Sequence, residues 1–79
     1  MNQPFVHIVS NPAVLGGKPC IQGTRISVEM ILEWMASGAS VSEIVLAYPQ
    51  LSKEAILEAL EYATQHLRNE TYLEIPIIA

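Results

Sequence analysis

The sequence predicts a small, mainly α-helical domain. We expect three helices, the last two with the proportions of a helix-turn-helix, preceded by a short N-terminal β-hairpin arm. Three observations lead to this fold: apolar residues recur at helical spacing, serines stand where each helix should begin, and a β-prone run precedes a glycine-rich turn. A length of 79 residues suits one domain. We place it at residues 1–70, with the β arm over 1–26, the helices over 27–69 and a separate tail over 71–79.

The β arm begins with FVHIV, residues 5–9, a short run rich in β-branched residues. Asn11-Pro12 ends it, because the residue before a proline favours extended geometry. The glycine-rich stretch GGKPCIQGTRI follows at residues 16–26. Within it, residues 19–22 and 24–26 are expected to form short strands or the two sides of a hairpin.

The first two helices carry start and stop signals. Ser27 can cap the first helix, and Gly38 ends it because glycine adopts a left-handed conformation cheaply. Residues 40–43, SVSE, form a capping box that starts the second helix. Pro49 stops this helix, since it lacks an N–H donor.

The third helix is expected to run from its N-cap at Ser52 to about Arg68. One stripe of this helix is apolar and should face the core, and the opposite side should face solvent. The expected apolar stripe is Ile56, Leu57, Leu60, Ala63 and Leu67. The expected polar side is Lys53, Glu54, Glu58, Glu61, Gln65 and Arg68.

The tail TYLEIPIIA, residues 71–79, differs from the helices. It is apolar and β-branched, and Pro76 excludes it from a central strand. We therefore expect an extended edge segment that can add a strand to the sheet edge of a partner protein. The candidate partner-binding residues are Tyr72, Leu73, Ile75, Ile77 and Ile78.

Composition also points to a partner. Hydrophobic residues make up 51% of the chain and charged residues only 15%. Because a domain of this size has more surface than interior, some apolar side chains should face a partner, either another copy of the chain in a homo-oligomer or another protein. The chain has no run of 18 apolar residues and a single cysteine, Cys20, which together favour the cytoplasm and exclude a membrane span.

Catalytic and cofactor motifs are not evident. Gly17-Lys18 is followed by Pro19, whereas a phosphate-binding P-loop requires serine or threonine there. The glutamate pairs four residues apart suit a solvated helix face better than a metal site, because no histidine or aspartate stands beside them. We expect Cys20 to be a small buried hydrophobe and His7 to face solvent. We therefore predict no enzyme activity, no cofactor and no metal.

DNA binding is a weaker hypothesis. The second and third helices have the proportions of a helix-turn-helix, and Lys18, Arg25 and Lys53 are the candidate phosphate contacts. The net charge of −4 and a pI near 4.9 argue against an autonomous nucleic-acid binder. The third helix is also acidic, so a helical packing unit that does not read DNA remains an alternative. Trp34 and Tyr48 suit the core or a dimer seam better than a base-stacking platform.

Residues 16–63 resemble a bacterial and archaeal family, the domain of unknown function 433. The resemblance covers 48 of the 79 residues and rests on GGKP-x-I-x-GTRI, the helix break ASGAS, and YPQLS followed by a helix that ends in EYA. Cys20 and Gln22 depart from the valine and arginine expected there, and Gln22 weakens a basic loop. Members of this family resemble winged or homeodomain-like helix-turn-helix domains, so the resemblance implies a helix-turn-helix-like fold of that kind. It also implies an antitoxin of a type II toxin–antitoxin pair, of the VapB kind. Such an antitoxin binds a small ribonuclease toxin with a PIN-like fold and can repress its own operon by binding operator DNA.

Two functions therefore remain open. The first is a toxin-neutralising module with autoregulatory DNA binding. The second is a non-catalytic interaction or oligomerisation module without DNA binding. In either case GGKPCIQGTRI is expected to be a rigid β-turn arm packed on the helices, with Lys18 and Arg25 at its accessible end.

Overall fold

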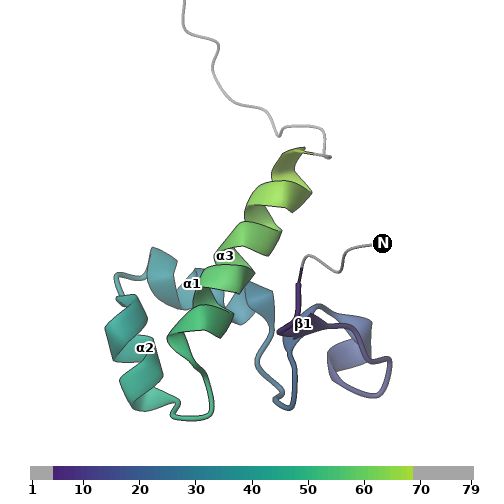
Figure 1. The fold of residues 1–79 in the computed structure, drawn as a ribbon, viewed down its shortest axis with the longest axis horizontal. Helices are drawn as coiled ribbons and strands as arrows, with labels where there is room; N and C mark the ends of the chain where they lie inside the picture. The colour runs from purple at the N-terminus through teal and green to yellow at the C-terminus, as the bar shows by residue number, and fades with distance from the viewer. Residues whose placement is uncertain (1–4, 69–79) are drawn as a thin grey trace, which may run out of the picture.

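The computed structural model describes residues 5–68 and shows three helices preceded by a two-stranded antiparallel sheet (Figure 1). In chain order the elements are β1 (Ile8–Val9), the 3-10 turn η1 (Leu15–Gly17), β2 (Cys20–Ile21), α1 (Val28–Ala36), α2 (Val41–Ala47) and α3 (Lys53–Arg68). The predicted mainly helical fold with a short N-terminal sheet is confirmed. The predicted tail over 71–79 lies outside the described residues.

Each α-helix begins at the serine expected from the sequence. The hydroxyls of Ser27, Ser40 and Ser52 each accept a hydrogen bond from the backbone N–H three residues later, at 3.0, 3.1 and 3.0 Å. The second start is a full capping box, because Glu43 Oε1 also accepts from the Ser40 N–H at 2.8 Å. These caps satisfy N–H groups that have no partner within the helix.

The helix ends also follow local chemistry. Gly38 follows α1 with a φ of +108°, in the region that side-chain-bearing residues rarely adopt. α2 ends at Ala47, and the next residue, Tyr48, has a non-helical φ of −128° and ψ of 81° because Pro49 follows it. The turn between α2 and α3 is residues 48–52.

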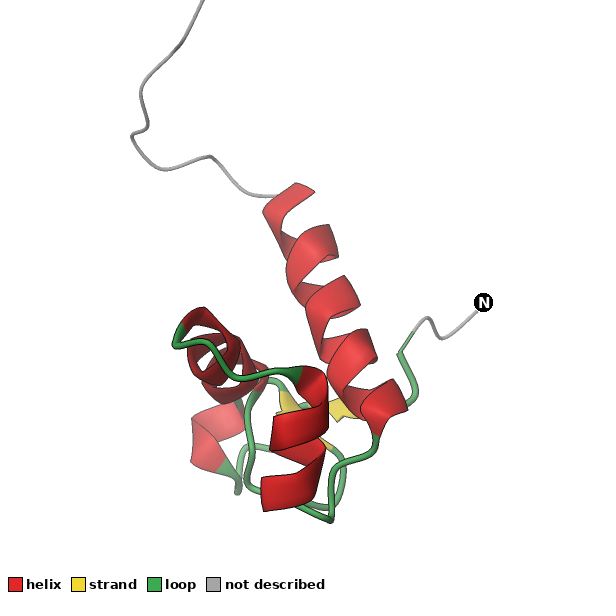
Figure 2. Ribbon diagram, turned by 90° about the vertical axis from the view of Figure 1, so that its left-hand side faces the viewer, coloured by secondary structure: helices red, strands yellow, loops and turns green. Residues whose placement is uncertain are grey.

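The core lies where α3 crosses α1 and α2 and touches β1 (Figures 1 and 2). Its side chains come from every α-helix, from β2 and from the turn between α2 and α3. The buried members are Ile21, Ile26, Val28, Ile31, Ile44, Leu51, Ala55, Ile56 and Ala59. Trp34 and Tyr48 pack against this cluster and stack with ring centroids 4.5 Å apart, as the core interpretation predicted.

The strands are shorter than predicted. From the run 5–9 only Ile8–Val9 forms a strand. Residues 24–26 form no strand of their own, but the chain does turn back beside β2: the Ile21 N–H donates to the carbonyl of Ile26 at 2.9 Å, and Cys20 and Ser27 form an isolated antiparallel bridge. The reason is local. The Thr24 hydroxyl donates to the carbonyl of Ile21 at 2.8 Å and accepts from the N–H of Ile26 at 3.0 Å. These bonds take up the backbone groups that a strand would need.

The predicted apolar stripe of α3 was wrong at two positions. Leu57 and Leu67 are 46% and 58% exposed, whereas Ala55 and Ala59 are buried beside Ile56. Small alanines let α3 approach the rest of the domain closely, so the buried face is centred on them. The later turns of α3 stand clear of the body, which leaves Leu67 without a core to enter (Figure 2).

Candidate functional site

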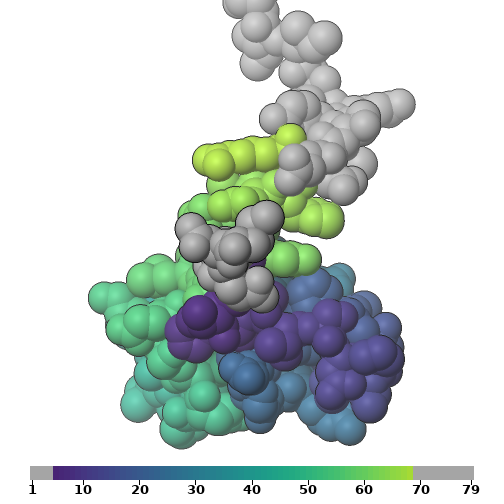
Figure 3. Space-filling view, turned by 45° about the vertical axis from the view of Figure 1, so that its right-hand side comes forward, coloured from purple at the N-terminus to yellow at the C-terminus, as the bar shows by residue number. Residues whose placement is uncertain are grey.

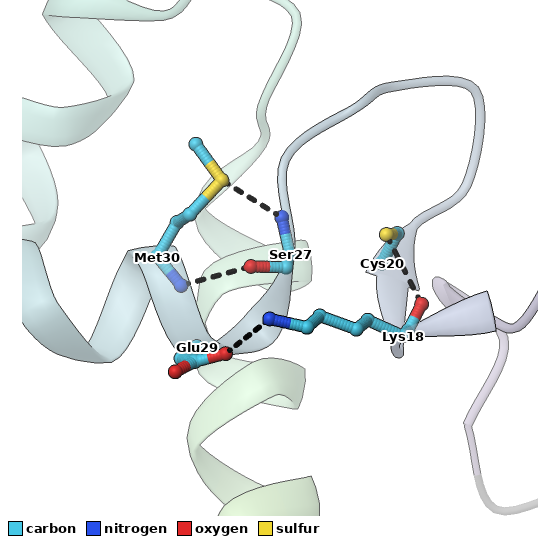
Figure 4. Close-up of polar contacts among 5 residues, drawn as sticks. All are labelled: Lys18, Cys20, Ser27, Glu29 and Met30. Carbon is cyan, nitrogen blue, oxygen red and sulfur yellow. Dashed lines mark hydrogen bonds and ion pairs between the residues drawn. The ribbon is translucent and has the colours of Figure 1, made fainter. Parts of the chain in front are cut away.

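The three predicted DNA contacts lie at separate places on the surface. Lys18 lies beside the start of α1, Arg25 lies in the exposed turn before α1, and Lys53 is the exposed first residue of α3. They line different hollows of the described surface. The Lys18 ammonium is also 3.2 Å from the Glu29 carboxylate, with both side chains 61% exposed (Figure 4). Their role in DNA binding stays a prediction, and the geometry does not gather them into one basic patch.

The glycine-rich loop is a rigid turn fixed to α1 and β1. The Val28 N–H donates to the carbonyl of Pro19 at 2.9 Å, and the Gln22 N–H donates to the carbonyl of His7 at 2.7 Å. Cys20 is 3% exposed and its thiol donates to the carbonyl of Lys18 at 3.1 Å, so the prediction of a buried cysteine is confirmed (Figure 4). The loop therefore positions the start of α1 through backbone hydrogen bonds.

A carboxylate of α3 holds the N-terminal strand in place. Glu58 Oε1 accepts from the backbone N–H of His7 at 2.7 Å, and Glu58 Oε2 lies 2.8 Å from His7 Nδ1. The two side chains are only 15% and 37% exposed, respectively. The predictions that His7 faces solvent and that Glu58 belongs to the polar side of α3 were therefore wrong. The residues are 51 positions apart, and no local pattern in the sequence signals the contact.

This contact changes the acidity of Glu58. Burial raises the pKa of its carboxyl. The hydrogen bonds from the side chain and backbone of His7 lower this pKa, and together they outweigh the effect of burial. The pKa of Glu58 therefore lies below the ordinary value of 4.5. At neutral pH the carboxylate is ionised and accepts both bonds, so the pair ties β1 to α3.

The most apolar hollow is a groove between α1 and the later turns of α3. Its volume is about 560 Å³. Apolar side chains make most of its walls, and four polar residues lie around them. The apolar residues are Pro19, Val28, Leu32, Tyr62, Ala63 and Leu67, and the polar residues are Lys18, Ser27, Glu29 and His66. We call this feature the α1–α3 groove.

The groove exists because α3 is much longer than the helix it packs on. α3 has 16 residues and α1 has nine, which correspond to roughly 24 and 14 Å of helix axis. The space-filling view shows the last described turns of α3 rising above the body (Figure 3). The apolar side of α3 therefore continues past the core, and Leu67 is left on the surface. The sequence pattern assigned Leu67 to the core and so missed the groove.

Metal sites and membrane-spanning helices are the other features that residues 5–68 could provide. Over residues 5–68, histidine, cysteine and acidic side chains form no group of three or more that suits a metal ion. Among the helices described, none combines the length and the apolar character needed to cross a membrane. The α1–α3 groove is thus the strongest candidate site, and its lining is mostly apolar.

Comparison with known proteins places the chain in a family. The family model described as "Protein of unknown function (DUF433)" matches residues 8–63. The chain belongs to the DUF433 family. The match takes in every strand and helix from β1 onwards, except the last turns of α3. It includes most of the apolar groove residues, and Leu67 lies beyond it.

Two relatives extend this DUF433 assignment. The chain is 39% identical over 56 residues to the uncharacterized protein y4eO of Sinorhizobium fredii, and it spans about a quarter (25%) of that protein's length. The crystal structure of a DUF433 member from Anabaena variabilis has 32% identity and a TM-score of 0.74. That similarity covers 78% of this chain and 61% of the other, so both relatives contain more chain than the shared domain. The solved relative bears out the DUF433 fold.

Proposed function

We propose that this DUF433 chain is an antitoxin that binds and neutralises a PIN-like ribonuclease toxin. The observation that carries the proposal is the α1–α3 groove. It is a mostly apolar hollow on a small domain whose own core does not fill it. Apolar grooves between helices are a common docking site for a partner's helix or extended segment.

Two further features support a protein partner. The chain carries a net charge of −4, which complements the basic surface that a ribonuclease needs to hold RNA. The tail over 71–79, which lies outside the described residues, begins three residues after the end of the helix that forms one wall of the groove. The tail and the groove together would form one continuous apolar surface for the toxin.

Operator DNA is the less supported partner. The exposed residues of α3 include Glu54, which follows Lys53 directly, and Glu61, about two turns further along, and acidic side chains repel the phosphate backbone. Lys18 is already paired with Glu29. We propose that the isolated chain binds DNA weakly, and that any autoregulation depends on positive charge from the bound toxin.

A pull-down from the native cells tests the proposal. The tagged full-length chain should retain a small protein in stoichiometric amount, and that protein should cleave RNA unless the chain is present. Leu67→Glu should abolish retention, because it places a charge in the α1–α3 groove. The matched control is Leu46→Glu, which makes the same change at an 83% exposed leucine of α2, away from the groove.

The outcomes separate the two functions. A ribonuclease that is lost with Leu67→Glu and kept with Leu46→Glu supports the antitoxin. Recovery of the chain with only further copies of itself contradicts it and supports an oligomerisation module. Circular dichroism on both variants checks that each keeps its helices.

A further inference from the structure

The α1–α3 groove raises the question of what covers it when no partner is bound. Its most exposed wall residue, Leu67, stands next to Arg68, the last described residue. Eleven residues, 69–79, follow from this point. The chain therefore leaves the described domain at one end of the groove.

The residues that follow have the composition of a groove-binding segment. If residues 72–78 are extended, Leu73, Ile75 and Ile77 point to one side, because side chains alternate along an extended chain. Pro76 holds the residue before it in extended geometry and prevents a helix. One face of the segment is then entirely aliphatic, like the walls of the groove.

The segment is also long enough. The groove wall on α3 runs from Leu67 back to Tyr62, which is roughly 7.5 Å along the helix axis. Residues 69–71 provide a link of up to about 10 Å, in which the chain can reverse. Seven further residues span up to about 24 Å in extended form, more than enough to cover both walls.

We propose that residues 72–78 dock into the α1–α3 groove of their own chain, with Leu73, Ile75 and Ile77 against its apolar walls. The docking itself does not depend on the toxin. Its consequence, a competition between the tail and a toxin for the groove, rests on the proposed function. The groove and the tail, which together form the proposed partner-binding surface, would then cover each other in the free chain.

The short link to α3 raises the concentration of the tail at the groove. A segment joined by a short link is present at an effective concentration of roughly millimolar, so even weak intrinsic affinity fills the groove. If the tail occupies the groove for about 90% of the time, a partner that needs the empty groove binds about tenfold more weakly. A partner that contacts the groove but not the tail should then bind about tenfold more tightly when the tail's aliphatic face is removed.

The test uses the full-length chain labelled with nitrogen-15. One variant replaces the groove-facing residues, Leu73→Ser, Ile75→Ser and Ile77→Ser together. The matched control replaces apolar residues on the opposite face, Tyr72→Ser with Ile78→Ser. Amide chemical shifts are compared with the unmodified chain at several protein concentrations.

Docking predicts that the triple variant shifts the amides of Val28, Leu32 and Ala63, which line the groove, and leaves those of α2 unchanged. The control should move the groove amides far less, and the effect should be the same at every concentration. Unchanged groove amides in the triple variant would overturn the proposal, as would equal effects of both variants. A shift that appears only at high concentration would also overturn it, since the occupant would then be the tail of a second copy. None of these readouts involves a toxin, so failure here leaves the antitoxin proposal to its own test.

Discussion

Replacing Glu58 with glutamine should weaken the attachment of the N-terminal strand to α3. The carboxylate accepts from the backbone N–H of His7 at 2.7 Å and contacts His7 Nδ1 at 2.8 Å. Glutamine removes the negative charge and keeps only one acceptor oxygen, because its NH2 group cannot accept a hydrogen bond. The rings of Phe5 and Tyr62, with centroids 5.4 Å apart, also join this segment to α3, so the attachment is weakened and not abolished.

The size of the effect follows from the geometry. A hydrogen bond to a charged group contributes about 1.5–3 kcal/mol when it is buried. His7 is 37% exposed, and water can partly replace the lost bond on that side. We therefore expect Glu58→Gln to lower the free energy of unfolding by about 1.5 kcal/mol, which corresponds to a fall in Tm of roughly 6–12 °C for a domain of this size.

Urea unfolding followed by the fluorescence of Trp34 measures this change, because Trp34 is the single tryptophan and packs against the core. The matched control is Glu61→Gln, one turn further along α3, where the glutamate is exposed and accepts a hydrogen bond from the side chain of Gln65 on the helix surface. The control should lose less than about 0.5 kcal/mol. Equal losses in the two variants would refute the strand-tethering role of Glu58.

The same pair gives a pH dependence with a definite sign. The pKa of Glu58 is lower in the folded state than its ordinary value of 4.5. Its contribution is therefore fully present above about pH 5 and disappears as the pH falls through the folded-state pKa. The stability difference between the unmodified chain and Glu58→Gln should therefore shrink as the pH falls below about 5. A difference that grows as the pH is lowered below 5 would contradict this assignment.

Three other predictions concern the core, a cap and DNA. Ile31→Ala should cost about 2–5 kcal/mol in urea unfolding, since Ile31 is fully buried, and a loss below 1 kcal/mol would contradict its place at the centre of the core. Ser40→Ala should cost about 1 kcal/mol by removing the cap of α2, whereas the exposed Ser42→Ala should change little, and equal effects would count against the cap. In fluorescence anisotropy, a dimer using Lys18 and Arg25 on each chain would neutralise about four phosphates, giving a salt slope no steeper than about −3.6. A steeper slope would show phosphate contacts that this surface does not account for.

The helix boundaries were predictable because short-range chemistry decides them. A serine that caps the N–H three residues later, or a proline that follows the last turn, acts within a few positions of the chain. The family resemblance was visible for a similar reason, since it rests on turn residues at fixed spacing, and the DUF433 match over residues 8–63 confirms it. The burial of Cys20 also followed from its apolar neighbours.

Only the tertiary structure decided which faces of the helices are buried in the core and which remain on the surface. The apolar pattern of α3 was compatible with more than one buried face, and close packing selected the face with Ala55 and Ala59. Leu67 is equally apolar in the sequence, yet the shorter α1 contributes only its first turns to this region and does not cover Leu67, so Leu67 lines a groove instead of the core. The bond between His7 and Glu58 likewise needs two distant segments at hydrogen-bond distance. Local periodicity therefore determined where the helices are, and the relative lengths and contacts of the packed elements determined where the candidate site is.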